Sequence, residues 1–445
     1  MIESATDSQR LQPRAIRLAK RLAGNVVARN AASLYAVQFC RKIFPLISIP
    51  YLARTLGPAG WGTVAFVQSL SEFLVLWIEF GFNLSATRDI AHHRYSPEEC
   101  GRIASGVMAA QILLAITGAA MAGFVALQFP ALRADSRLIA AGLIYAVAQG
   151  LMPLWFFQGL ERLTSAAILE VIGKALALAG LFLLVHGTTD GWKVLALQAI
   201  APGISGIVGL WMARRSFRLC NPSWNLVGDA LRSGWRMFVF RSGESLYGVG
   251  NAFILGLFAP PTMVGYFAGA DKLTRAAGGL LNPIKDAIYP RITLLTRHAP
   301  ERAARLLRIG AVLMVSGGAA LTCILFLGAP FLVNRIMGPQ FDPAVNVVRI
   351  MSLLPLLLSI TNSVGLQSLL PMRRDREINS IILRAGAINV LLAFFIAPRW
   401  AHNGMAGTVI IAETFVCLSM IAAARRKPSV DGSPALPCAA ASGEL

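Results

Sequence analysis

Charged side chains occur inside several long apolar segments of this sequence, where a charge is costly unless it has a partner or a function. In the first segment Arg41 falls on a polar stripe at helical spacing, and Lys42 lies beside it. The other members of this stripe are Gln38, Pro45 and Ser48. Because both cations lie half way along a span, they are a long reach from the nearest headgroups. We therefore expect Arg41 and Lys42 to face a cavity rather than lipid.

The eighth apolar segment carries the densest charge. Asp271, Lys272 and Arg275 lie deep within it, and three such groups on a lipid-facing helix would be prohibitive, so we expect a wet cavity lined by protein. The seventh segment adds Arg241 and Glu244 on one face. Clusters of Arg and Lys suit phosphate groups in particular. Six cations are the candidate ligands of an anionic substrate: Arg41, Lys42, Arg54, Arg241, Lys272 and Arg275.

Carboxylates inside the segments are candidates for coupling to a counter-ion, either a proton or sodium. Glu72 lies near the middle of the second apolar segment, where it is either a proton carrier or the partner of a cavity cation, and the residues leave both open. Asp271 and Glu244 are the other coupling candidates. Glu170 and Lys174, four residues apart in the fifth segment, are predicted to form an intrahelical ion pair.

Twelve apolar segments must position these side chains. The chain has 445 residues, of which 56% are hydrophobic and 14% charged, against about 25% charged in a soluble domain. This composition excludes intrinsic disorder and a water-soluble enzyme, and each segment is long enough to cross a bilayer. The segments are residues 30–52, 61–82, 103–129, 138–157, 165–185, 193–213, 237–258, 263–289, 309–333, 346–370, 381–398 and 404–424. The predicted fold is an all-α integral membrane protein with about twelve transmembrane helices around a central cationic cavity.

The distribution of Lys and Arg predicts the orientation in the membrane. There are 41 Lys and Arg against 22 Asp and Glu, which gives a net charge of +19. With the N-terminus in the cytoplasm, 26 of these cations fall in inside segments and 6 in outside connections. This is the positive-inside pattern, and it predicts that both termini are cytoplasmic. The surplus charge is therefore a signal of topology, and no nucleic-acid partner is expected.

The predicted organisation has two lobes and two cytoplasmic ends. Residues 1–29 form a basic N-terminus, either an amphipathic helix on the anionic inner leaflet or a disordered tail. An N-terminal lobe spans 30–213, a cytoplasmic linker 214–236, a C-terminal lobe 237–424 and a disordered tail 425–445. The connections are too short to host catalysis, and no Walker motif, dinucleotide fingerprint or metal-ligand cluster occurs. We expect no enzyme activity, catalytic residue, cofactor or metal site.

Several runs of residues carry a resemblance to a known family. They are IPYLARTLGPAGWG (49–62), EFGFNLSATRDIA (79–91), VGYFAGADKLTRA (264–276), IYPRI (288–292) and MGPQFDPAVNVVRIM (337–351). In this order they resemble the bacterial polysaccharide flippases, for O-antigen or exopolysaccharide, of the multidrug/oligosaccharidyl-lipid/polysaccharide exporter superfamily. The likeness covers about residues 28–425.

The resemblance implies two lobes of six helices and a particular cargo. That cargo is an oligosaccharide on undecaprenyl diphosphate, moved by alternating access from the inner to the outer leaflet of the bacterial inner membrane. The polymer would be O-antigen, capsule or exopolysaccharide, and a polysaccharide polymerase is an expected partner. Distant relatives that flip the peptidoglycan lipid precursor also place cations in the first span, near where Arg41 and Lys42 fall.

Two other classes of protein compete with the flippase. A drug or small-metabolite cation antiporter of the same superfamily should have a cavity that favours carboxylates over cations. A membrane enzyme, such as an oligosaccharide polymerase or a glycosyltransferase, should have a large outside loop or an acidic motif on a loop, and the sequence has neither.

Overall fold

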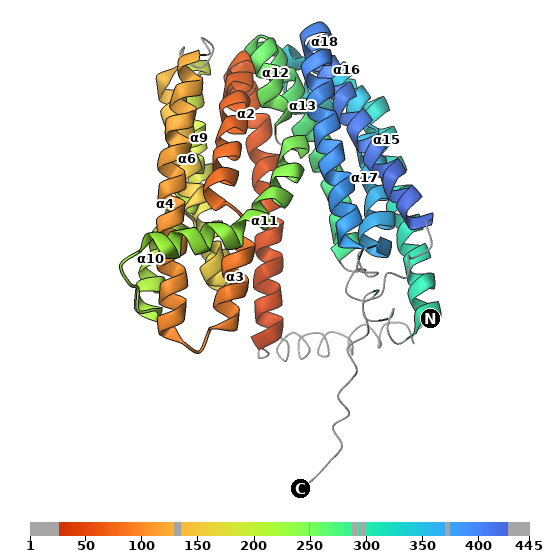
Figure 1. Ribbon diagram of the computed structural model, residues 1–445. Coiled ribbons are helices and arrows are strands. Elements are labelled where there is room, and N and C mark those ends of the chain that lie inside the picture. Colours follow the sequence, from red (N-terminus) through yellow and green to blue (C-terminus); the bar gives the residue numbers. More distant parts are fainter. Residues whose placement is uncertain are drawn as a thin grey trace, which may run out of the picture.

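The computed structural model describes residues 26–128, 135–248, 250–286, 299–369 and 374–425, together with Ile288, Ile292 and Leu295. Within these residues the regular structure is helical and no strand occurs, which confirms the predicted all-α class (Figure 1). Eight of the described helices are long and apolar enough to cross a membrane. Most of the predicted N-terminal segment and tail, residues 1–25 and 426–445, lies outside the described residues.

The helices fall into two halves joined by one long helix. The N-terminal half contains α2 (Val26–Glu79), α3 (Phe82–His92), α4 (Pro97–Gln128), α6 (Ser136–Gly150), α7 (Leu154–Gly159), α8 (Leu163–Leu184), α9 (Gly191–Gln198) and α10 (Ile200–Ser216). The joining helix is α11 (Trp224–Gly248). The C-terminal half contains α12 (Asn251–Phe258), α13 (Pro261–Gly278), α15 (Pro300–Ile336), α16 (Ala344–Met351), α17 (Leu354–Thr361) and α18 (Asp375–Arg425). Short helical turns cover Thr188–Asp190, Gly279–Leu281 and Pro339–Phe341, and a π-helical segment covers Asn362–Leu369.

The two longest helices each contain two of the predicted spans. α2 has 54 residues and is interrupted at Gly57, whose φ of 67° is a backbone conformation that glycine adopts without strain. α18 has 51 residues and is interrupted at Ala401, with a φ of 44°. Because a single crossing needs only about 20 residues, each helix is long enough for two crossings. The count of twelve spans stays a prediction. Among the described residues eight helices are candidate spans, and the charged α13 is not one of them.

Two predicted segments are broken in the structure. The segment 138–157 is divided between α6 and α7, with Pro153 as the residue before α7. The eighth segment, 263–289, contains Gly278 and Gly279, and α13 ends at Gly278, where a 3-10 turn over Gly279–Leu281 follows. The charged part of α13 therefore precedes the break and remains a regular helix.

The two halves meet closely at one end of the molecule, at the top of Figure 1. A Cβ atom on Gly62 of α2 would lie 1.7 Å from the carbonyl oxygen of Pro261, and one on Gly265 of α13 would lie 1.9 Å from the carbonyl oxygen of Pro58. Only glycine allows two backbones to approach this closely. We call this end, defined by residues 58–62 and 261–265, the closed end.

At the opposite end, α11 joins the N-terminal half to the C-terminal half. It packs on α3 and α4 on one side and on α18 on the other. The turn at Phe80–Gly81 lies against it, since a Cβ atom on Gly81 would be 2.6 Å from the Met237 Cβ. The Phe80 ring stacks on Phe238 with centroids 4.6 Å apart. The second half of the predicted linker 214–236 is thus helical from Trp224 onward.

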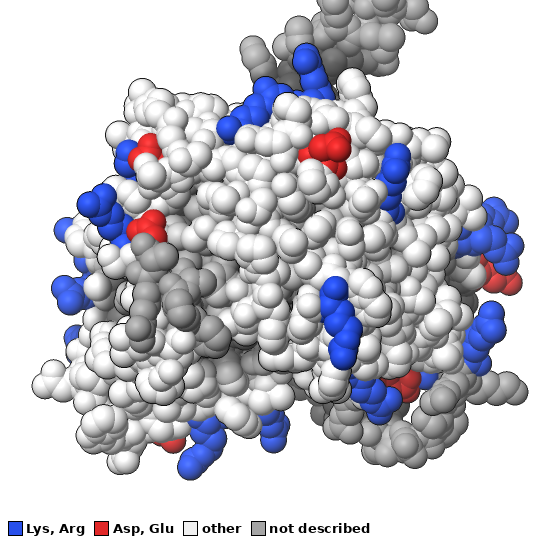
Figure 2. All heavy atoms as spheres, turned by 90° about the horizontal axis from the view of Figure 1, so that it is seen from above, with Lys and Arg blue, Asp and Glu red and all other residues white. Residues whose placement is uncertain are grey.

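The outer surface suits a bilayer. Large apolar side chains of α4, α8 and α15 are exposed, among them Ile116, Phe124, Leu183 and Leu327. Exposed apolar surface of this extent is expected where lipid covers the protein. Seen from the closed end, charged side chains are sparse and scattered over a largely uncharged face (Figure 2).

Candidate functional site

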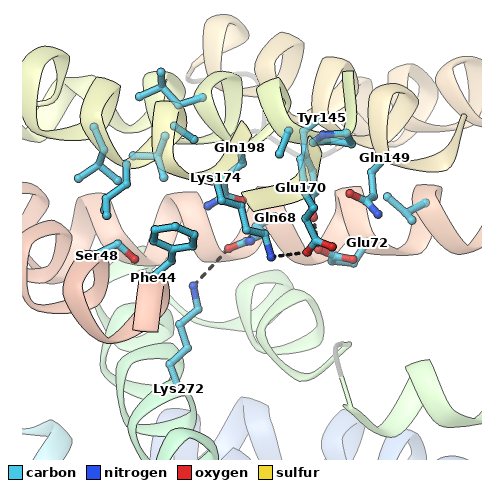
Figure 3. Close-up of a pocket in the computed structure, with 18 of the residues that line it drawn as sticks. Phe44, Ser48, Gln68, Glu72, Tyr145, Gln149, Glu170, Lys174, Gln198 and Lys272 are labelled. Atoms are coloured by element: carbon cyan, nitrogen blue, oxygen red, sulfur yellow. Dashed lines mark hydrogen bonds and ion pairs between the residues drawn. The ribbon is translucent and has the colours of Figure 1, made fainter. Parts of the chain in front are cut away.

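A cavity of about 890 Å³, lined by apolar surface and a set of polar side chains, lies between the two halves. One wall comes from α2, α6, α8 and α9 of the N-terminal half, and the other from α11 and α13 (Figure 3). The structure therefore brings together side chains from the first, second, fourth to sixth, seventh and eighth predicted segments. Binding sites of this kind combine apolar surface with a few placed polar groups, and the volume is in the upper part of the usual range of roughly 300–1,000 Å³.

Lys272 projects from α13 across the cavity toward the N-terminal half (Figure 3). Its Nζ donates a hydrogen bond to Gln68 Oε1 at 3.3 Å, and Gln68 Nε2 donates to Gln198 Oε1 at 3.0 Å. The same Nζ lies 4.5 Å from the ring centroid of Trp61, a cation–π distance. Within the described part of the chain, Lys272 thus makes its hydrogen bond to an amide oxygen and its ring contact to Trp61, while the carboxylates of Asp271 and Glu72 act on it electrostatically without a direct ion pair.

Glu72 has a neutral partner in the structure. The hydroxyl of Tyr145 donates to Glu72 Oε1 at 2.6 Å. Arg275, one of the predicted cavity cations, pairs with Asp271 and not with Glu72, with 2.7 Å between Nε and Oδ1. The half-buried carboxyl group is therefore held by a phenol from α6, in a short hydrogen bond.

The other cavity cations are matched by carboxylates. Lys174 Nζ lies 2.8 Å from Glu170 Oε1, which confirms the predicted ion pair within α8. Arg241 from α11 donates to Glu79 Oε2 of α2 at 2.9 Å, so this ion pair joins the two sides of the cavity. The described lining includes four cations and three carboxylates. The predicted cationic character of the whole cavity is not confirmed by this lining.

Four predicted site residues have another position or lie outside the description. Arg54 is at the closed end, where its guanidinium donates to the backbone carbonyl of Arg335, and it is not among the residues that line the cavity. The side chains of Arg41, Lys42 and Glu244 lie outside the described residues, although all three positions fall on helices.

The residues that sequence reasoning missed are mainly neutral. Tyr145, Gln149 and Gln198 line the cavity and point toward its centre (Figure 3). In the sequence each of these residues is an amide or a phenol within an apolar segment. Such neutral polar groups are common in spanning helices, so they indicate a site less strongly than a charged residue does. Their convergence depends on how α6 and α9 pack against α2.

The fold and the cavity define a multi-pass, all-α membrane protein of the transporter class. Residues 27–295 match the model of the family described as "Polysaccharide biosynthesis protein". This match covers more than half of the chain, so the protein belongs to that family.

Two curated relatives are similar over nearly their whole length. A protein of Escherichia coli (strain K12) named "Putative O-antigen transporter" is 31% identical over 400 residues, which is 88% of this chain and 95% of the relative. A protein of Shigella dysenteriae with the same name is 29% identical over 405 residues, 89% of this chain and 100% of the relative.

Solved structures with a similar fold share little sequence with this chain. One is the lipid II flippase MurJ in an inward closed conformation, with a TM-score of 0.73 and 12% identity, covering 88% of this chain and 87% of MurJ. Another is an inward-facing multidrug resistance MATE transporter of the MOP superfamily, with a TM-score of 0.61 and 13% identity, covering 86% and 97% of the two chains. At these identities the likeness shows the fold alone.

Proposed function

We propose that the protein flips a polyprenyl-diphosphate-linked oligosaccharide from the cytoplasmic to the periplasmic leaflet of the bacterial inner membrane by alternating access. Its family and its curated relatives make it a polysaccharide transporter or flippase at the coarser level. The product would serve the synthesis of O-antigen, capsule or exopolysaccharide.

Lys272 is the observation that carries this proposal. It extends into the cavity, and in the described structure its direct contacts are an amide oxygen and an aromatic ring, with the carboxylates of Asp271 and Glu72 acting on it only at longer range. A diphosphate offers stronger, charge-assisted hydrogen bonds, so it displaces Gln68 at little cost. Arg275 and Arg241 line the same side of the cavity, each in an ion pair with a carboxylate, and their remaining N–H groups are further hydrogen-bond donors for an anion. An anionic head group therefore has a binding position on α13.

The physical demands of the cargo agree with such a cavity. The sugars are too polar to cross the hydrocarbon core, so they must pass through a protein-lined space, while the polyprenyl tail remains in the bilayer. An inside-negative potential favours outward movement of an anion, by about 2.3 kcal/mol per charge per 100 mV when the full field is crossed.

The closed end is proposed to face the periplasm. The positive-inside distribution predicts that residues 53–60 and 186–192 lie outside and that both termini lie inside. In this orientation the contact between Gly62 and Pro261 shuts the cavity toward the periplasm. Outward release would then require α2 and α13 to separate. Among the coupling candidates, Glu72 faces the cavity through a neutral partner, whereas Asp271 is neutralised by Arg275.

A drug or cation antiporter is the second candidate. Three carboxylates, Glu72, Glu79 and Glu170, line the wall of the N-terminal half, and a solved multidrug transporter shares the fold. An organic cation would be attracted to that wall and repelled by Lys272. The two candidates therefore predict opposite effects when the Lys272 charge is removed.

Transport by purified protein in vesicles tests the proposal. The substrate is the lipid-linked oligosaccharide extracted from cells that lack this gene. We expect Lys272→Gln to slow its flipping about ten- to a hundredfold, since a lost charge-assisted contact costs about 1.5–3 kcal/mol. The matched control is Lys285→Gln, because Lys285 does not line the cavity. No flipping by the wild-type protein, or faster flipping of an organic cation such as ethidium by the Lys272 variant, would favour the antiporter.

A further inference from the structure

The polar groups of the cavity are segregated by wall. On the described wall of the N-terminal half are one cation, three carboxylates, several amides and the phenol of Tyr145. The described polar side chains on the opposite wall, from α11 and α13, are the three cations Arg241, Lys272 and Arg275. Arg241 and Arg275 are held in ion pairs with Glu79 and Asp271, whereas Lys272 has no direct ion pair among the described residues. Each wall therefore offers a different chemistry to a ligand that lies between them.

We propose that the cavity recognises its cargo in two parts, with the diphosphate on the α13 wall and the sugar on the N-terminal wall. Within this division, Gln149 and Tyr145 are specificity-determining residues that contact sugar hydroxyls. This inference rests on the proposed function and goes beyond it by assigning each part of the cargo to a wall.

Electrostatics exclude the diphosphate from the N-terminal wall. The cation on that wall, Lys174, is held 2.8 Å from Glu170 within the same helix. Glu72 adds another carboxylate beside them (Figure 3). Like charges at close range repel, so an anionic group on this wall costs free energy. The same group gains free energy beside Lys272.

Hydrogen-bond chemistry favours sugar on the N-terminal wall. Each sugar hydroxyl is both a donor and an acceptor, and an amide such as that of Gln149 offers both complements. The Tyr145 hydroxyl donates a hydrogen bond to Glu72, and the oxygens of both groups keep lone pairs that accept hydrogen bonds from sugar hydroxyls. Gln149 points into the cavity next to this pair (Figure 3).

Aromatic side chains complete the sugar wall. Phe44 and Phe73 of α2 line the cavity with apolar ring faces. The C–H faces of sugar rings are apolar and pack on such rings, as other apolar groups do. The combination of ring faces, amides and a phenol in one wall is therefore suited to a neutral, hydroxyl-rich ligand more than to a phosphate.

Binding to two probes separates the two walls. The first probe is the lipid-linked oligosaccharide extracted from cells that lack this gene, and the second is undecaprenyl diphosphate without a sugar. Dissociation constants are measured for the purified wild type, Gln149→Ala, Tyr145→Phe and Lys272→Gln. The matched control is Gln158→Ala, an amide that lies outside the cavity lining. Thermal melting in detergent verifies that each variant is folded.

Opposite patterns are expected for the two walls. Gln149→Ala and Tyr145→Phe should each raise the dissociation constant of the oligosaccharide probe about two- to tenfold, the effect of one lost hydrogen bond. Neither change should alter the dissociation constant of the sugar-free probe. Lys272→Gln should raise the dissociation constants of both probes by a similar factor. The division into walls is overturned if Gln149→Ala weakens the binding of both probes equally. It is also overturned if neither Gln149→Ala nor Tyr145→Phe changes the binding of the oligosaccharide probe. Failure of the wild type to bind either probe overturns the proposed function itself.

Discussion

Replacement of Gly62 by alanine should open the closed end. The added Cβ atom would lie 1.7 Å from the carbonyl oxygen of Pro261 and 2.6 Å from the amide nitrogen of Gly265. Real Cβ contacts do not fall below 3.0 Å, so the two backbones must separate by about 1.3 Å, the difference between those distances. Because both neighbours are backbone atoms of α13, no side-chain rotation relieves the clash.

That separation breaks the other contacts of the closed end. Gln340 Nε2 donates to the carbonyl oxygens of Ala53 and Arg54, each at 3.3 Å, and these bonds cannot lengthen by 1 Å or more and survive. Overpacking of this kind costs about 1–3 kcal/mol. The closed state would therefore lose population by about 5- to 150-fold relative to a state in which α2 and α13 are apart.

Cysteine labelling measures this shift. A single cysteine at Ser48, which lines the cavity, is introduced after the six native cysteines are replaced by serine. A membrane-impermeant maleimide added to the periplasmic side should label it faster in Gly62→Ala than in the parent. The matched control is Gly203→Ala, where an added Cβ atom meets nothing within 4 Å. Unchanged labelling together with normal transport in Gly62→Ala would refute the closed end as a gate.

Three other outcomes follow from the topology and the ion pairs. A cysteine at Asp190 should be labelled from the periplasmic side, and labelling from the cytoplasmic side alone would reverse the proposed orientation. Glu72→Gln keeps an oxygen that accepts from the Tyr145 hydroxyl, so membrane abundance should hold while any proton flux linked to transport disappears, as followed with a pH dye trapped in vesicles. Normal flux in that variant would remove Glu72 from coupling. Glu79→Gln should lower the amount of protein in the membrane, because it leaves the half-buried charge of Arg241 without its partner, and the double variant with glutamine at both positions should restore that amount. Equal amounts of all three proteins on a membrane blot would show that the pair adds no stability.

The sequence alone determined the class of the fold and the elements that bear the site. Apolar runs of about 20 residues must form helices in a bilayer, because every backbone polar group has to be satisfied within its own segment. The depth of Lys272 and Arg275 in such a run was enough to predict a cavity, since lipid does not tolerate these charges. The four-residue spacing of Glu170 and Lys174 also determined their ion pair, which is a local property of one helix.

Tertiary packing decided which groups meet and which wall each one joins. Tyr145 and Glu72 are 73 residues apart, and Lys272 and Gln68 are 204 apart, so no local rule connects them. Arg54 shows the converse, because its charge suggested a substrate ligand while packing directs it to the backbone of Arg335 at the closed end. Segregation of cations on α13 from amides on α6 and α9 arises only when two halves of the chain enclose one space. Helical periodicity gives the face of each residue, but the partner of that face depends on contacts between segments that are distant in the sequence.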